Sequence, residues 1–163
     1  MNKITLNEFP THIAKTNNKI KANKMLKINN QAIYNGFIGR FTRNIVINNL
    51  HDYLSIEIGR YVPGLIRKKI ELPVNITVDI YTVINHGSIS MRSGKLCWKP
   101  AKASYEPTWD IDNLATIWIK CINDVLVKEG VLPDDNVSCI SGMRYNFIEV
   151  QDLKDRKLEI TIE

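Results

Sequence analysis

Hydrophobic residues recur along the chain at two different spacings, and each spacing predicts one kind of element. Strict alternation of apolar and polar residues over 74–80 (VNITVDI) puts successive side chains on opposite faces of a strand, which Pro73 opens. The same alternation predicts three further strands, at 3–6, 143–147 and 158–162. The chain therefore carries strands in both its first and its second half.

Two other segments have apolar residues every three to four positions, which is typical of a helix packed on one face. In the first, 31–54, we expect an interruption at Asn48-Asn49, with Arg40 and Arg43 outside the apolar stripe. In the second, 113–129, we expect the polar residues Thr116, Lys120 and Asn123 to lie opposite the apolar face. That apolar face consists of Leu114, Ile117, Trp118, Cys121, Ile122, Val125 and Leu126.

The order of these elements predicts an α+β fold, with a mixed or antiparallel sheet and two main helices packed on one side of it. With 163 residues, the chain is long enough for one domain with a substantial core, so we expect a single domain over 1–163. The sequence has no internal repeat and no low-complexity linker.

Positive charge is concentrated in the first part of the chain. Residues 1–109 hold 16 Lys and Arg against 6 Asp and Glu, whereas residues 110–163 hold 6 against 11, within a total net charge of +5. A basic part joined to an acidic part suggests that one holds a polyanion and the other supplies chemistry. The plainer alternative is a charge pattern that only keeps the protein in solution.

Two basic segments could contact nucleic-acid phosphates, which need charge but carry no sequence information. The first, 15–27, is predicted to be an exposed loop or arm, and the second, 92–102, a basic hairpin or loop. The alternative for both is an ordinary solvated surface loop. The candidate DNA-binding residues are Lys19, Lys21, Lys24, Lys27, Arg92, Lys95, Lys99 and Lys102.

No apolar run is long enough to cross a bilayer, and no signal-peptide core follows Met1, so we expect a cytoplasmic (intracellular) protein with no membrane partner. The three cysteines, Cys97, Cys121 and Cys139, match neither a zinc spacing nor a disulfide framework. We expect them to be reduced thiols, mostly buried.

Two acidic pairs flank the second helix: Asp110 with Asp112, and Asp134 with Asp135. Each pair has an ordinary explanation, because Asp112 stands at a helix N-cap position and Asp134-Asp135 follows Pro133 as turn residues do. Neither explanation accounts for Asp110. If the later pair folds back beside the earlier one, the carboxylates repel each other unless a cation or protons neutralise them.

Oxygen-only ligands suit Mg²⁺, with Mn²⁺ as a substitute, rather than zinc. At a phosphodiester such an ion would generate a nucleophilic hydroxide and stabilise the developing charge, to which Lys120 and the helix N-terminus could contribute. The residues alone leave metal-dependent phosphoryl chemistry and purely structural carboxylates both open.

At these residues the chain resembles the RusA family of Holliday-junction resolvases. The similarity lies in 110–113 (DIDN), in Lys120 leading into 121–126 (CINDVL), and in 130–135 (GVLPDD), and it continues into the strand at 157–162. It also covers the strand opened by Pro73, and the start of the chain is similar to some members. It is thin between 31 and 72.

The resemblance implies a RusA-like α+β nuclease that forms a homodimer, binds four-way DNA junctions and, with Mg²⁺, nicks two strands symmetrically. It implies that Asp110, Asp112 and Asp135 are the essential metal-binding carboxylates and that Asp134 is secondary. The family's helix lysine falls on Lys120 when counted back from Gly130, and on the position of Thr116 when counted forward from Asp112.

We therefore expect a Mg²⁺-dependent, structure-selective endodeoxyribonuclease in DNA recombination or repair, with Asp110, Asp112, Asp135 and Lys120 as its catalytic residues. Two alternatives remain open at this point. One is a module that binds junctions or single strands without cutting them, and the other is a small phosphohydrolase acting on nucleotides.

Overall fold

The computed structural model describes residues 2–7, 12–14, 25–27, 33, 39–67, 70–84, 88–99 and 111–163. The helices are α2 (Arg40–Gly59), α3 (Val62–Arg67), α4 (Ile111–Lys128) and the short 3-10 turn η2 (Leu153–Asp155). The strands are β1 (Asn2–Asn7), β2 (His12–Ala14), β3 (Met25–Lys27), β4 (Val74–Thr82), β5 (Ser88–Arg92), β6 (Lys95–Lys99), β7 (Ile140–Glu149) and β8 (Lys157–Ile162).

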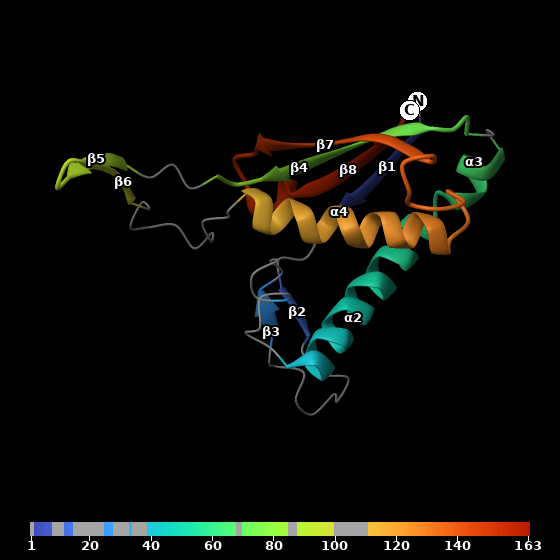
Figure 1. Ribbon diagram of the computed structural model, residues 1–163, viewed down its shortest axis with the longest axis horizontal. Helices are drawn as coiled ribbons and strands as arrows, with labels where there is room; N and C mark the ends of the chain where they lie inside the picture. Colours follow the sequence, from blue (N-terminus) through green and yellow to red (C-terminus); the bar gives the residue numbers. More distant parts are fainter. Residues whose placement is uncertain are drawn as a thin grey trace.

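A four-stranded mixed sheet in the order β1-β8-β4-β7 forms the centre of the fold (Figure 1). Strands β1 and β4 both pair with β8 in antiparallel register, while β4 and β7 run parallel. Alternation puts Val74, Ile76, Val78 and Ile80 of β4 in the core, with 0% exposure each. The predicted α+β class with a mixed sheet is confirmed, and the predicted strands at 3–6, 74–80, 143–147 and 158–162 are all present.

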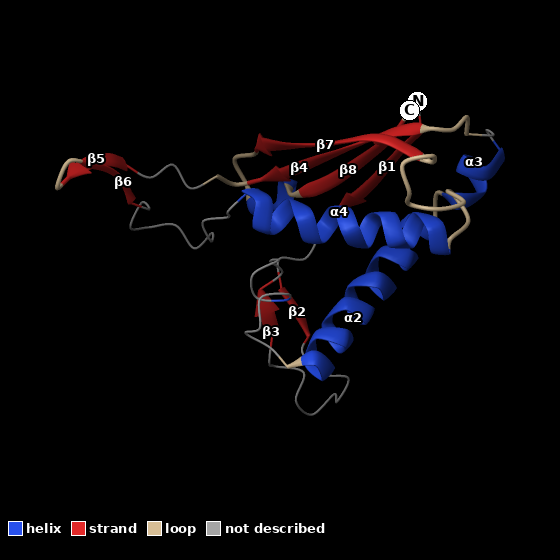
Figure 2. Cartoon of the chain, in the orientation of Figure 1, coloured by secondary structure: helices blue, strands red, loops and turns tan. Residues whose placement is uncertain are grey.

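The two main helices lie on the same side of this sheet, as predicted (Figure 2). Helix α4 runs along the sheet, and α2 crosses α4 at an angle (Figure 1). Tyr53 on α2 packs edge-on against Trp118 on α4, with 6.5 Å between the ring centroids, and His51 Nε2 lies 3.3 Å from Asp124 Oδ2. The helices therefore share one hydrophobic core with the sheet.

Helix α2 departs from its predicted form in two ways. It begins at Arg40, directly after Gly39, and it runs to Gly59 with no interruption at Asn48-Asn49, so that part of the prediction is wrong. The physical reason is an unbroken stripe at four-residue spacing, which packs against the core and overrides the weak helix preference of two asparagines. The stripe consists of Val46, Leu50, Leu54 and Ile58. The predicted start of the helix, 31–38, lies outside the described residues except for Ile33.

Candidate functional site

Helix α4 begins at Ile111, so Asp112 is its second residue and not its N-cap, and the predicted cap position is wrong. Acidic residues are favourable in the first turn of a helix, because its backbone N–H groups have no partner within the helix. Asp110 and the side chain of Asp112 lie outside the described residues.

Helix α4 ends in a turn that needs a glycine for its backbone conformation. Gly130 has φ of +71°, the left-handed region that other residues rarely adopt. Val131 N–H donates to Leu126 O at 2.9 Å, and Gly130 N–H donates to Val127 O at 3.0 Å, the two hydrogen bonds of a Schellman motif. Val131 and Leu132 then bury their side chains, which fixes the direction in which the chain leaves the helix.

The next residues form an acidic loop, Pro133 to Ser138, that is held by its own side chains. Asp134 accepts two short hydrogen bonds, one to Oδ1 from the Asp135 N–H at 2.7 Å and one to Oδ2 from Asn136 Nδ2 at 2.7 Å. Asn136 Oδ1 in turn accepts from Ser138 N–H at 2.9 Å. Asp135 is exposed, and no described residue donates a hydrogen bond to its carboxylate. Asp134 thus shapes the loop, and Asp135 stays available.

Asp112 and the acidic loop lie at opposite ends of α4 and not side by side within one chain, contrary to the sequence-based expectation. The acidic loop lies at the C-terminal end of α4, and Asp112 is in the first turn at the opposite end (Figure 1). A helix of 18 residues is about 27 Å long. Within the part of the chain that the structure describes, no three acidic, histidine or cysteine side chains are grouped closely enough to hold an ion.

Lys120 is exposed on α4, but it lies near the middle of the helix. Relative to Asp112 it is displaced by about 12 Å along the axis and rotated by about 80°. Thr116, also exposed, is displaced by about 6 Å and rotated by about 40°. The sequence left two positions, 116 and 120, for the family's helix lysine. Position 116 is the nearer of the two to Asp112, and it is occupied by Thr116.

The basic segments are described in part. Lys19, Lys21, Lys24 and Lys102 lie outside the described residues. Lys27 ends β3, which pairs with β2 in antiparallel register, so 15–27 does not consist of loop alone. The predicted hairpin at 92–102 is present as strands β5 and β6, and Arg92 and Lys95 flank its turn, both exposed, while Lys99 ends β6.

Sequence reasoning missed a buried carboxylate, Glu159, on β8, one of the two interior strands of the sheet. Its side chain is 6% exposed and bonds to Lys3 at 2.9 Å, Lys157 at 2.8 Å and the Tyr81 hydroxyl at 2.9 Å. Burial alone would raise the pKa of Glu159, but hydrogen bonds from Lys157, Lys3 and Tyr81 outweigh it and lower the pKa to about 2. Lys3 and Tyr81 are far from Glu159 along the chain, and no local pattern could indicate the contact.

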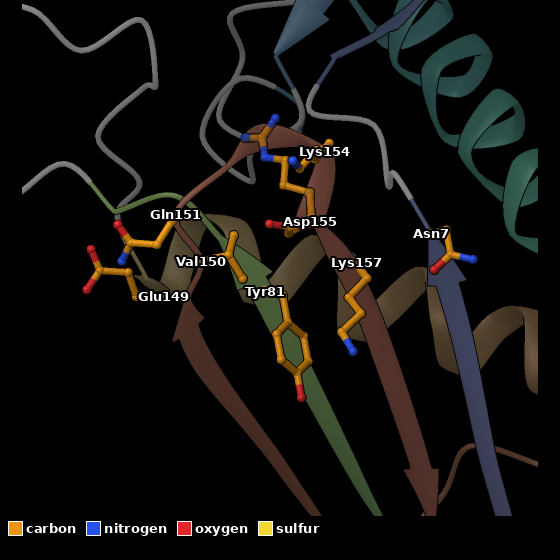
Figure 3. Close-up of a pocket in the computed structure, with 9 residues that line it drawn as sticks. Asn7, Tyr81, Glu149, Val150, Gln151, Lys154, Asp155 and Lys157 are labelled. Atoms are coloured by element: carbon orange, nitrogen blue, oxygen red, sulfur yellow. The ribbon is translucent and has the colours of Figure 1, made fainter.

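An open cavity of about 580 Å³ lies where β4 and β7 end and β8 begins (Figure 3). Its basic side chains already have partners: Lys157 bonds to Glu159, Lys154 lies 3.2 Å from Asp152, and Arg156 Nε lies 3.4 Å from Thr82 Oγ1. We regard it as a weaker candidate than the acidic loop for that reason. The lining residues are Asn7, Tyr81, Glu149, Val150, Gln151, Lys154, Asp155, Arg156 and Lys157.

Comparison with models of known protein families finds no match for this chain, and comparison with curated proteins finds none either. Among the described residues, no helix combines the length and the apolar character needed to cross a membrane.

Proposed function

We propose that this chain is a Mg²⁺-dependent endonuclease that nicks four-way DNA junctions symmetrically. The observation that carries the proposal is the shaped acidic loop after α4, in which Asp134 and Asn136 hold the backbone while no described residue bonds to the Asp135 carboxylate. A simple turn has no need of that second carboxylate. The resemblance of 110–113 and 130–135 to the RusA family supports the same function.

The residues present suit a divalent ion of this kind. Asp110, Asp112 and Asp135 offer only carboxylate oxygens, the donors that Mg²⁺ and Mn²⁺ prefer, and the thiol of Cys121 on α4 is buried in the core. When bound, the ion would supply activation of a water molecule and neutralisation of charge at the scissile phosphate. The chain's own part is to place Asp112 in the first turn of α4 and Asp135 in the loop that follows Gly130.

Because α4 separates the two acidic pairs, the proposed site requires a second copy of the chain. A two-fold axis perpendicular to the helix would reverse it, so that the Asp112 end of one copy faces the Asp135 end of the other. Two equivalent sites then form, one for each strand to be nicked. The homodimer is thus part of the proposed mechanism and not an addition to it.

The edge of the sheet beside α4 is the place where we put that second copy. Strand β7 is at the end of the sheet, and Met143 and Tyr145 on it are 37% and 39% exposed. Asn123 in the middle of α4 donates from Nδ2 to Met143 Sδ at 3.2 Å, which ties helix and edge strand together. An edge strand with partly exposed apolar side chains is a common surface for strand pairing between chains.

A labelled synthetic four-way junction incubated with Mg²⁺ tests the proposal. We expect paired nicks at symmetric positions, no nicks with EDTA, and little product from a linear duplex or a free nucleotide. The absence of symmetric nicks from the wild-type protein, or nicks that persist in Asp135→Asn, would contradict it.

A module that binds junctions without cutting them is the second candidate. It is favoured by the two local hydrogen bonds of Asp134, which an ordinary turn also makes. It predicts junction binding that EDTA leaves unchanged and no nicking under any metal condition.

A further inference from the structure

Strands β5 and β6 form a two-stranded ribbon with a tight, preorganised tip. Its two turn residues, Ser93 and Gly94, both have positive φ, at 50° and 71°. This is the conformation of a type I′ turn, whose twist matches that of the strands it joins. The register pairs Arg92 with Lys95 next to the turn and Met91 with Leu96 behind them.

The ribbon has one apolar and one basic face near its tip. Met91 and Leu96 are 66% and 76% exposed, and as a cross-strand pair they point to the same face. Ile89 and Trp98 occupy the next register positions of the same parity. Arg92 and Lys95, one position nearer the turn, point to the opposite face.

Nothing described covers the apolar pair. The ribbon extends away from the four-stranded sheet and its helices (Figure 2), and its only described strand pairing is between β5 and β6. A two-stranded ribbon by itself is marginally stable in water, and exposed Met and Leu side chains contribute to its stability only once a partner covers them.

The charge of the ribbon indicates what kind of partner covers it. Between Ser88 and Lys99 there are three basic residues, Arg92, Lys95 and Lys99, and no Asp or Glu. A polyanion satisfies that charge, and the unstacked base pairs at a DNA branch point offer a flat apolar surface to the other face. Linear duplex DNA offers the phosphates but not the unstacked bases.

We propose that the Met91–Leu96 pair packs against unstacked bases at the branch point of a DNA junction, while Arg92 and Lys95 contact the neighbouring phosphates. This inference rests on the DNA-binding part of the proposed function, but not on cleavage. The ribbon is then the element that distinguishes a branched DNA from a linear one, and the acidic loop is the element that cuts.

The test compares the double variant Met91→Ser/Leu96→Ser with the wild-type full chain, in EDTA, so that no cleavage is needed. Affinity is measured for a four-way junction, which carries 2-aminopurine at its branch point, and for a linear duplex of the same arm sequence. We expect the double variant to bind the junction about tenfold more weakly, to bind the duplex unchanged, and to lose the 2-aminopurine fluorescence increase.

Two controls separate packing from charge and from general surface effects. Ile56→Ser, which changes an apolar residue that is 63% exposed on α2, should leave both affinities unchanged. Arg92→Gln/Lys95→Gln should weaken junction and duplex equally and reduce the slope of log affinity against log salt by about 2.

Several results would overturn the inference. These are an unchanged junction affinity in Met91→Ser/Leu96→Ser, an equal loss for junction and duplex, or a change of oligomeric state without any change in binding, which would assign the apolar pair to a second copy. A wild-type protein that prefers the junction but never nicks it would end the proposed nuclease and leave the inference standing. If the wild type nicks junctions and the double variant keeps its preference for the junction, the proposed nuclease stands and the inference about the ribbon is wrong.

Discussion

Glu159 and Asp135 carry the same chemical group in opposite settings. Glu159 lies on the interior strand β8 of the sheet, 5% exposed, with three donors around its carboxylate. Asp135 lies in an exposed loop where no described residue bonds to its carboxylate, although its backbone N–H is held by Asp134. The carboxylate of Glu159 has its hydrogen-bond donors within the fold and is inaccessible. The carboxylate of Asp135 is accessible and has no donor among the described residues.

The difference separates stability from function. A buried carboxylate stabilises the fold only because its charge is compensated, and the same compensation leaves it no capacity to bind a ligand. An exposed carboxylate contributes little to stability, so a loop that holds it in place is better explained by something that it binds.

Asp135→Asn should reduce junction nicking by at least about 100-fold, because a lost carboxylate ligand removes several kcal/mol of charge stabilisation at the phosphate. Its melting temperature should be unchanged. Gel assays of nicking with Mg²⁺ and thermal unfolding measure the two effects. Asp155→Asn, another exposed carboxylate, serves as the matched control and should nick normally.

Mixing the inactive variants Asp112→Asn and Asp135→Asn should restore nicking, because half of the re-formed dimers are mixed and each mixed dimer has one intact site. The expected recovery is about a quarter of the wild-type sites. Denaturing and refolding the two proteins together, with each alone as control, gives the measurement. No recovery from an equal mixture would mean that each site is formed within one chain.

Glu159→Gln should lower the free energy of unfolding by roughly 2 kcal/mol, because it leaves two lysines beside a neutral amide. Binding and nicking, measured well below the melting temperature, should be unchanged. Denaturant unfolding of this variant and of Glu163→Gln, an exposed carboxylate after the same strand, makes the comparison. Equal stability of the two variants would mean that the Glu159 carboxylate does not stabilise the fold.

Acid should destabilise the wild-type protein through Glu159. Its pKa is lowered from 4.5 to about 2, so its stabilisation is complete above about pH 4.5 and is lost as the pH falls towards 2. Unfolding measured between pH 5 and pH 3 covers only part of this window, so the effect should be smaller than that of the substitution. In Glu159→Gln the same decrease should be weaker than in the wild type.

Gly130→Ala should cost about 1 kcal/mol of stability, since alanine in the left-handed region at the end of α4 is strained. Space does not limit the change, because no described atom lies within 4 Å of the added Cβ. If the acidic loop depends on this helix end, nicking should fall more than stability does. Gly59→Ala, whose φ is not in the left-handed region, is the matched control.

The sheet was largely predictable because its signal is local. Alternation in 74–80 corresponds to burial in β4, and the apolar face predicted for α4 is buried at Ile117, Trp118, Cys121 and Ile122. The Asn48-Asn49 interruption was wrong because packing of Leu50 and Leu54 decides the helix there. Asn123, predicted to lie opposite the apolar face, is 8% exposed, because β7 covers it through Met143.

The arrangement of the candidate site could not be predicted from the sequence. The helix length alone argues against convergence of the two acidic pairs, since 18 residues of helix leave their ends far apart. The roles of Asp134 and Asn136 depend on hydrogen bonds that form only in the folded loop. The Glu159 cluster joins residues from β1, β4 and β8, whose register is a property of the whole sheet.

Helix α4 also fixes the angular phase of the two acidic ends. From Asp112 to Lys128, the last residue of α4, the helix makes about four and a half turns, so its length sets the direction in which the chain leaves towards the acidic loop. Asn123, which contacts β7, is offset from Asp112 by only about 20° around the helix axis. One residue added to or removed from α4 would rotate the acidic loop by about 100° relative to Asp112. The spacing between the two motifs is therefore as much a part of the proposed site as the carboxylates.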